Sequence, residues 1–194
     1  MSGPAISTHQ TLLARLADGA DPGAWREFRD RYALLIRRFA EQQRLQPADC
    51  EDVVQDVFMA LTKAMPDFTY DPARGLFRSY LKTIVVHAVQ RFLRQKRGVD
   101  GLGDMDQPGP SGPETDERWE KEWRQYHLRE ALRIIEVEFN SQDRAAFDRY
   151  VLSGMGAAET ATALGLSIEQ VYQAKSRILR RLTQIIEARV REEG

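Results

Sequence analysis

Residues 157–171 read AAETATALGLSIEQV, and this stretch decides how the C-terminal third of the chain folds. An alanine-rich helix is followed by a turn at Gly165. Ser167, with Gln170 three residues later, is the capping-box signature that begins a second helix. The pattern therefore predicts a helix-turn-helix. Apolar residues at three- and four-residue steps along the second helix face the core. The opposite, outward face is polar and carries Gln170, Tyr172, Gln173, Ser176, Arg177 and Arg180.

Glutamine and arginine side chains are suited to reading base edges, and an α-helix fits the major groove of DNA. The outward face of the second helix therefore predicts binding to double-stranded DNA. The alternative is a helical hairpin with a merely solvated basic face. We favour DNA binding because the turn, the cap and the basic face coincide.

Upstream of this motif, residues 98–117 read GVDGLGDMDQPGPSGPETDE. Such a segment buries too little apolar surface to offset its conformational entropy. We therefore expect a flexible linker over residues 99–126, between domains at 1–98 and 127–194. Both domains show helical periodicity, and no stretch alternates with period two for long enough to indicate a strand. The fold class that we predict is all-α.

Charge is segregated along the chain, although the formal net charge is only −1. Residues 1–99 hold 15 Lys and Arg against 11 Asp and Glu, residues 100–126 hold three against eight, and residues 127–194 hold ten of each. Between Asp71 and Asp100 there are seven cations and no acid, interleaved with aromatic residues such as Tyr80. Cations that hold phosphates beside aromatic rings that stack on bases are typical of single-stranded nucleic-acid binding. The alternative is a solvated basic face.

An acidic cluster, DCEDVVQDVF, occupies residues 49–58. Carboxylates in the first turns of a helix suit its dipole, but four exceed that need. Asp49, Asp52 and Asp56 share one helical face, beside Gln55, which predicts a basic protein partner. Paired carboxylates could also serve an enzyme that processes nucleic acid with Mg²⁺, but these lie on a single helix.

Composition argues against several classes of protein. Cys50 is the only cysteine, and the three histidines are far apart in sequence, so we predict no metal site, no cofactor and no enzymatic activity. We find no signal peptide and no apolar run long enough to span a membrane, and we expect a cytoplasmic protein.

Three motifs, in order, resemble the extracytoplasmic-function sigma factors of bacterial RNA polymerase. They are DCEDVVQDVF at 49–58, FRSYLKTIVVHAVQRFLRQKR at 77–97, and RYVLSGMGAAETATALGLSIEQVYQAKSRILRRL at 149–182. The resemblance implies that the first docks on the β′ clamp helices of the polymerase. It implies that the second melts and holds the minus-ten promoter element, and that the third reads the minus-thirty-five element.

The resemblance also assigns roles to single residues. It implies contacts with polymerase for Asp49, Glu51, Asp52, Gln55 and Asp56. In the loop at 67–75 it implies a pocket for a flipped base, read by Tyr70, Asp71 and Arg74. It implies that the melted strand is lined by Phe77, Arg78, Tyr80, Lys82, His87, Gln90, Arg91 and Arg94. The polar face of the second helix in the helix-turn-helix would read the upstream major groove.

The implied partners are core RNA polymerase, through its β′ clamp helices and β flap, and promoter DNA in double- and single-stranded form. Control by an anti-sigma factor or by a regulatory kinase, with Thr62 and Thr69 as candidate phosphorylation sites, is left open. The rival hypothesis is a helix-turn-helix regulator that acts without being a polymerase subunit. That rival explains the C-terminal domain but not an acidic helix followed by an acid-free basic one.

Overall fold

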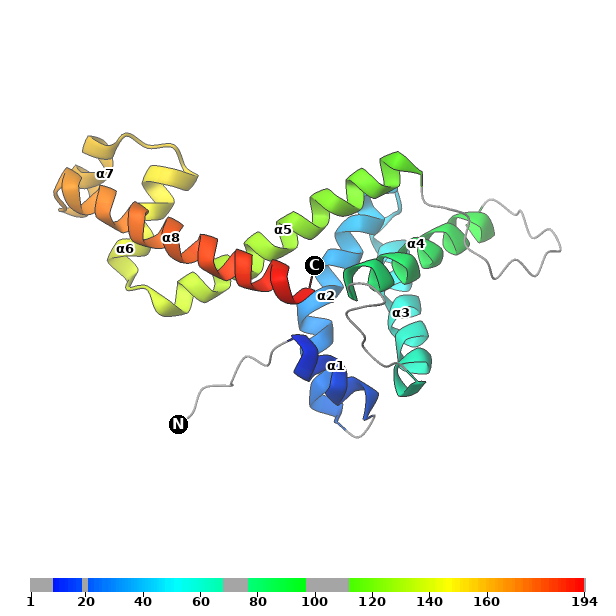
Figure 1. Cartoon of the computed structure of the whole chain (residues 1–194). Coiled ribbons are helices and arrows are strands. Elements are labelled where there is room, and N and C mark those ends of the chain that lie inside the picture. The colour runs from blue at the N-terminus through cyan, green and yellow to red at the C-terminus, as the bar shows by residue number, and fades with distance from the viewer. Residues whose placement is uncertain (1–8, 19–20, 68–76, 97–111, 194) are drawn as a thin grey trace. The chain divides into compact units, whose positions relative to one another are not determined.

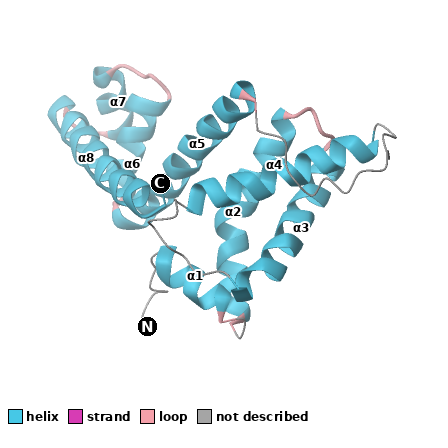
Figure 2. Cartoon of the chain, turned by 45° about the vertical axis from the view of Figure 1, so that its right-hand side comes forward, coloured by secondary structure: helices cyan, strands magenta, loops and turns pink. Residues whose placement is uncertain are grey.

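The structure is a computed structural model, and it describes residues 9–18, 21–67, 77–96 and 112–193 (Figure 1). Within these ranges every regular element is helical, and no strand is present (Figure 2). The prediction of an all-α fold is confirmed. The chain divides into two compact units, and each is described separately: unit 1 comprises residues 1–123 and 192–194, and unit 2 comprises residues 124–191.

The described part of unit 1 contains four α-helices, in line with the helical periodicity of the N-terminal domain, together with the first turns of a fifth helix. Their bounds are α1 His9–Ala17, α2 Pro22–Gln42, α3 Pro47–Ala64, the short 3₁₀ helix η1 Met65–Asp67, and α4 Phe77–Lys96. Pro22 and Pro47 stand in the first turn of their helices, where a missing N–H costs nothing.

The core of unit 1 is a cluster of aromatic rings from α2, α3 and α4. The Phe28 ring lies 4.6 Å from Tyr32, 5.7 Å from Phe58 and 5.9 Å from Phe77, centroid to centroid. Aliphatic side chains of the same helices are buried as well. The packing fixes the three helices relative to one another, and with them the charged faces that they carry.

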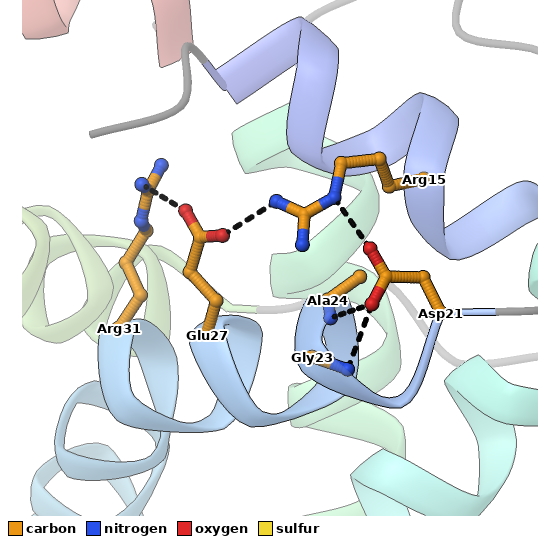
Figure 3. Close-up of polar contacts among 6 residues, drawn as sticks. All are labelled: Arg15, Asp21, Gly23, Ala24, Glu27 and Arg31. Carbon is orange, nitrogen blue, oxygen red and sulfur yellow. Dashed lines mark hydrogen bonds and ion pairs between the residues drawn. The ribbon is translucent and has the colours of Figure 1, made fainter. Parts of the chain in front are cut away.

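A polar network joins α1 to the start of α2 (Figure 3). The Asp21 carboxylate caps α2 by accepting hydrogen bonds from the backbone N–H of Gly23 at 2.8 Å and of Ala24 at 3.2 Å. Arg15 of α1 donates to Asp21 at 2.7 Å and to Glu27 at 2.8 Å. The hydrogen bond from Arg15 is the main reason why the pKa of Asp21 lies below its ordinary value.

The fifth helix corrects one expectation. Helix α5 spans Pro113–Glu138, so residues 113–126, which we assigned to the linker, are helical. The physical reason is a pair of indoles one turn apart: Trp119 is fully buried and Trp123 is 2% exposed. The Trp119 ring lies 5.4 Å from Phe39, and the Trp123 ring lies 6.5 Å from Tyr32. The apolar surface that the two indoles bury is a large favourable contribution against the entropy cost of ordering the segment. Residues 99–111 lie outside the described residues.

Unit 2 contains the remainder of α5 together with α6 Ser141–Phe147, the π-helical turn η3 Asp148–Leu152, α7 Ala157–Leu164 and α8 Ile168–Glu193, whose last two residues are assigned to unit 1. Its core joins side chains from α5, α6 and α8: Ala131, Ile135, Phe147, Ile178, Leu182 and Ile185. Helix α7 ends at Gly165, which has a left-handed backbone (φ 65°). A non-glycine residue is strained in this conformation, which explains the glycine at the turn.

Candidate functional site

Three carboxylates of the acidic helix α3 are paired within unit 1. Asp49 accepts from the backbone N–H of Gln46 at 3.2 Å and pairs with Lys96 of α4. The hydrogen bond from Lys96 is the largest cause of a lowered pKa at Asp49. Glu51 pairs with Arg37 of α2. These contacts hold the charges of α3 against neighbouring helices.

The same helix also presents groups to solvent. Asp56 pairs with Arg91 of α4 at 2.7 Å and is partly buried. Asp52 and Gln55 are exposed, and within the described part of the chain Asp52 makes no ion pair. Of the five residues that the resemblance assigned to polymerase binding, Asp52 and Gln55 are therefore the ones that a partner can reach without displacing an internal cation.

Gln55 also lines a groove between α2 and α3 that the sequence analysis missed. The groove has a volume of about 550 Å³ and combines an apolar floor with a cationic rim. Met59 in it is 50% exposed, and the Arg29 guanidinium stacks over the Phe58 ring at 5.2 Å. Below, the α2–α3 groove means the surface lined by Trp25, Arg26, Arg29, Gln55, Phe58, Met59, Thr62 and Lys63.

The signal for this groove was present in the sequence but weak. Phe58 and Met59 follow the acidic motif directly, and Met59 is a large apolar residue at a position that the helical periodicity places outside the core. Lys63 lies on the same helix, but the other two cations that line the groove, Arg26 and Arg29, come from α2, more than 25 residues earlier in the chain. Only the packing of α2 on α3 brings them together.

Helix α4 carries most of the residues predicted to hold the melted strand. Arg91 and Arg94 are exposed, whereas Tyr80, His87 and Gln90 are half-buried, as are the two cations nearest the start of the helix, Arg78 and Lys82. Burial raises the pKa of the Tyr80 hydroxyl, which therefore stays protonated and able to donate a hydrogen bond. We call the surface formed by these seven residues the α4 face.

Phe77 requires a correction. The resemblance placed it among the residues that line the strand, but its side chain is 1% exposed. Its ring lies in the core against Phe28 and Tyr32, so its role in this structure is packing. The three residues predicted to read the flipped base, Tyr70, Asp71 and Arg74, lie outside the described residues.

Two cations of the α4 face form ion pairs with α5. Lys82 pairs with Asp116 of α5 at 2.9 Å, and Arg78 pairs with Glu120 of the same helix. The Arg78 guanidinium also stands 5.7 Å from the centre of the Trp123 ring. The N-terminal turns of α5 therefore lie against the cations at the start of α4.

Unit 2 presents the predicted polar face of α8. All six of its residues are exposed, and Val171, Ala174, Ile178 and Leu182 are buried, as the periodicity predicted. The capping box is present: the Ser167 backbone N–H donates to Gln170 Oε1 at 2.7 Å, and the Gln170 N–H donates to Ser167 Oγ at 3.1 Å. Gln170 thus has its amide oxygen engaged in the cap, which leaves its amide nitrogen for other contacts.

Two further polar-face residues already have neighbours in unit 2. Arg177 donates to Asp143 of α6 at 2.7 Å. The Tyr172 ring packs edge-to-face on Tyr150 of η3 at 5.6 Å. Both contacts orient side chains that remain exposed, and pre-oriented side chains lose less entropy on binding.

Within the described ranges, no group of three or more metal-ligating side chains gathers in one place. Cys50 is buried, and burial is the main cause of its raised thiol pKa, so it acts as a packing residue. No helix among these residues is long and apolar enough to cross a membrane.

Comparisons with known proteins give a consistent result. The family model for sigma-70 region 2 matches residues 28–99. The RNA polymerase sigma factor CnrH of Cupriavidus metallidurans is 28% identical over 186 residues, which cover 91% of this chain and 94% of that protein. The RNA polymerase sigma factor NccH of Alcaligenes xylosoxydans xylosoxydans is 28% identical over 201 residues, 97% and 98% of the two chains.

A solved structure of CnrH in complex with the cytosolic domain of CnrY aligns with a TM-score of 0.39 at 23% identity, over 92% of this chain and 97% of that one. The classification rests on sequence. The region 2 model matches the segment that holds the acidic and basic helices, and both curated sigma factors match almost end to end. The comparisons thus show a sigma-70 region 2 domain at residues 28–99, in a chain that is similar over nearly its whole length to two RNA polymerase sigma factors.

Proposed function

We propose that the two units of this sigma factor bind different targets: unit 1 binds core polymerase and the minus-ten element, and unit 2 binds the minus-thirty-five element. As an RNA polymerase sigma factor, the chain binds core polymerase and promoter DNA and directs transcription initiation. In our proposal it catalyses no covalent step, needs no cofactor and acts in the cytoplasm. Unit 1 binds core polymerase and captures the melted strand, and unit 2 reads the upstream duplex.

The observation that carries the proposal is the charge of α4. Its 20 residues include five cations and no carboxylate. Exposed Arg91 and Arg94 can hold phosphates, and half-buried Tyr80 and Gln90 offer a ring and an amide beside them. This combination is suited to unpaired bases, which can stack on aromatic rings and donate or accept hydrogen bonds along their edges.

Binding to core polymerase is proposed for α3 and the α2–α3 groove. Asp52 and Gln55 supply exposed polar contacts, and the adjacent groove offers Phe58 and Met59 as an apolar floor. An interface of this kind, with an apolar centre and a polar rim, is typical of specific protein–protein contacts. Glu51 and Asp56, which are paired with Arg37 and Arg91, lie on the same helix.

Unit 2 is proposed to read the minus-thirty-five element through α8. The exposed face offers glutamine and arginine side chains on a helix that begins at a defined cap. The first turns of a recognition helix are the ones that reach base edges in the major groove. Arg177 and Arg180, about one and two turns beyond Gln173, are suited to the flanking phosphates.

A regulatory partner stays a prediction. Thr62 lines the α2–α3 groove and its hydroxyl donates to the Phe58 carbonyl at 2.8 Å. A phosphate at Thr62 would break that hydrogen bond and add negative charge within the proposed polymerase-binding surface. An anti-sigma factor could act by covering the same groove. Thr69 lies outside the described residues.

The test of the polymerase-binding surface is a charge reversal at Asp52. Asp52→Arg changes an exposed side chain that makes no ion pair among the described residues, so the fold of unit 1 should survive. The matched control is Asp18→Arg, which reverses an exposed carboxylate at the end of α1 and outside the groove. We expect Asp52→Arg to weaken binding of core polymerase at least tenfold in a titration with labelled protein, and the control to bind as the wild type does. Equal binding by both variants would contradict the assignment.

A further inference from the structure

An acidic segment of the chain lies on the basic face that is proposed to bind DNA. Lys82 pairs with Asp116 at 2.9 Å, and Arg78 pairs with Glu120. Arg78 and Lys82 are one turn apart on α4, and Asp116 and Glu120 are one turn apart on α5. Two successive charges on one helix thus meet two successive charges on the other, in antiparallel order.

This contact is anchored by packing. Trp119 and Trp123 are buried against Phe39 and Tyr32 of α2. Arg118 donates to the backbone carbonyl of Gln42 at 3.0 Å. The first turns of α5 are therefore docked in unit 1, and their carboxylates are held at fixed positions over α4.

The composition of the segment makes it resemble a polyanion. Residues 113–123 read PETDERWEKEW, with five carboxylates and two cations. Two of these carboxylates contact α4, and Glu114 and Glu117 are exposed and do not. The segment supplies negative charge at positions where the phosphates of a bound strand would otherwise meet Arg78 and Lys82.

We propose that the N-terminal turns of α5 are a built-in competitor for nucleic acid on the α4 face. Asp116 and Glu120 occupy Arg78 and Lys82 in the free protein, and a DNA strand must take these cations from them. The inference rests on the proposed function, because it requires the α4 face to be the strand-binding surface. It predicts that the free chain binds single-stranded DNA more weakly than its cationic helix allows.

The ion pairs between α4 and α5 are weak enough for a bound DNA strand to replace the carboxylates. The side chains of Asp116 and Glu120 are each 46% exposed. Ion pairs at this level of exposure are weak and are screened by salt. Neutralising both carboxylates should raise the affinity for single-stranded DNA about three- to tenfold, the range expected for two such pairs.

The test measures fluorescence anisotropy of a fluorescein-labelled 20-nucleotide oligo(dT) titrated with the full-length chain. The variant is D116N/E120Q. The matched control is E114Q/E117Q, which removes the same two negative charges from the same segment without touching α4. We expect tighter binding by D116N/E120Q and binding within about twofold of wild type by the control. Freeing two cations should also steepen the slope of log K against log salt by up to about 1.4.

Equal gains by the two variants would overturn the inference, because the effect would then follow from net charge alone. No gain by D116N/E120Q would also overturn it. If the double variant unfolds, Asp116→Asn alone, which keeps the pair between Arg78 and Glu120, should give a smaller gain in the same direction. Thermal unfolding of each variant shows whether the fold is kept.

A third variant separates this inference from the proposed function. R91Q/R94Q removes two exposed cations of the α4 face that do not contact α5, and it should weaken oligonucleotide binding. Weaker binding by R91Q/R94Q together with no gain by D116N/E120Q would leave the DNA-binding face intact and refute the competitor alone. Unchanged binding by R91Q/R94Q would refute the assignment of the α4 face as the DNA-binding surface.

Discussion

Replacement of Trp119 by alanine should destabilise unit 1 strongly. The indole is fully buried against Phe39 and the neighbouring Trp123. A buried indole removes about 150–250 Å² from water, which corresponds to about 4–6 kcal/mol at 25 cal/mol per Å². Because the unfolded chain already buries part of that surface and the site can relax, we expect a loss of about 3–5 kcal/mol in the free energy of unfolding.

The assay is native-state hydrogen exchange, because it reports on each helix separately. In the wild type, the amides of residues 117–123 should be protected together with those of α2, since the two segments pack as one unit. In Trp119→Ala the protection of both should fall. The control is Trp25→Ala, which removes the same indole from the half-buried wall of the α2–α3 groove and should cost about 1–2 kcal/mol.

Unprotected amides at 117–123 in the wild type would refute the docking of α5. A loss below about 1 kcal/mol in Trp119→Ala would refute it as well. Either result would restore the flexible linker over residues 99–126 that the composition predicted. It would also remove the physical basis of the contact between α5 and the α4 face.

Three further predictions concern the helix ends. Gly165→Ala should lower the free energy of unfolding by about 1–2 kcal/mol, because the left-handed φ of 65° strains an alanine although nothing lies within 4 Å of its Cβ. Gly165→Asn should lower it by less, because asparagine tolerates this backbone conformation better. Equal losses in the two variants would contradict the backbone argument. Ser167→Ala should cost about 1 kcal/mol through loss of the α8 cap, and no change in melting temperature would contradict the capping box. Asp21→Asn should lower the melting temperature more at pH 7 than at pH 2.5, because the pKa of Asp21 is lowered in the folded state. The stabilisation is complete above the unfolded pKa near 3.8 and declines as pH falls toward and through the folded value. A melting difference that is the same at both pH values would contradict the third prediction.

Much of the fold could be predicted because helical periodicity is a local signal. The alternation of buried and exposed residues along α8, from Val171 to Leu182, followed from spacing alone. The turn at Gly165 and the capping box at Ser167 could also be predicted, because each depends on residue types within a few positions.

The features of the fold that could not be predicted depend on contacts between segments that are distant in sequence. Composition assigned residues 113–126 to a linker because acids, glycine and proline surround them, and it gave no weight to Trp119 and Trp123 one turn apart. Phe77 was assigned to the strand-binding surface because it begins the basic motif, yet its ring completes the core. In both cases the partner that buries the ring lies on α2, more than 35 residues away in sequence.

In the candidate site, too, local motifs could be predicted and contacts between helices could not. The acidic and basic helices were predicted as separate motifs, and their residue types indicated protein and DNA partners. Their mutual ion pairs, such as that between Asp56 and Arg91, could not be predicted, because they require α3 and α4 to pack side by side. Nor could the α2–α3 groove, whose two walls come from different helices.

The central claim is that this chain confers promoter-specific initiation on core RNA polymerase. The most direct measurement is transcription in vitro from sheared bacterial genomic DNA by core polymerase, with and without the chain, followed by mapping of the RNA 5′ ends. We predict discrete start sites that appear only with the chain, that are lost with Asp52→Arg and that are retained with Asp18→Arg. Start sites that do not depend on the chain, although it binds core polymerase, would contradict the claim.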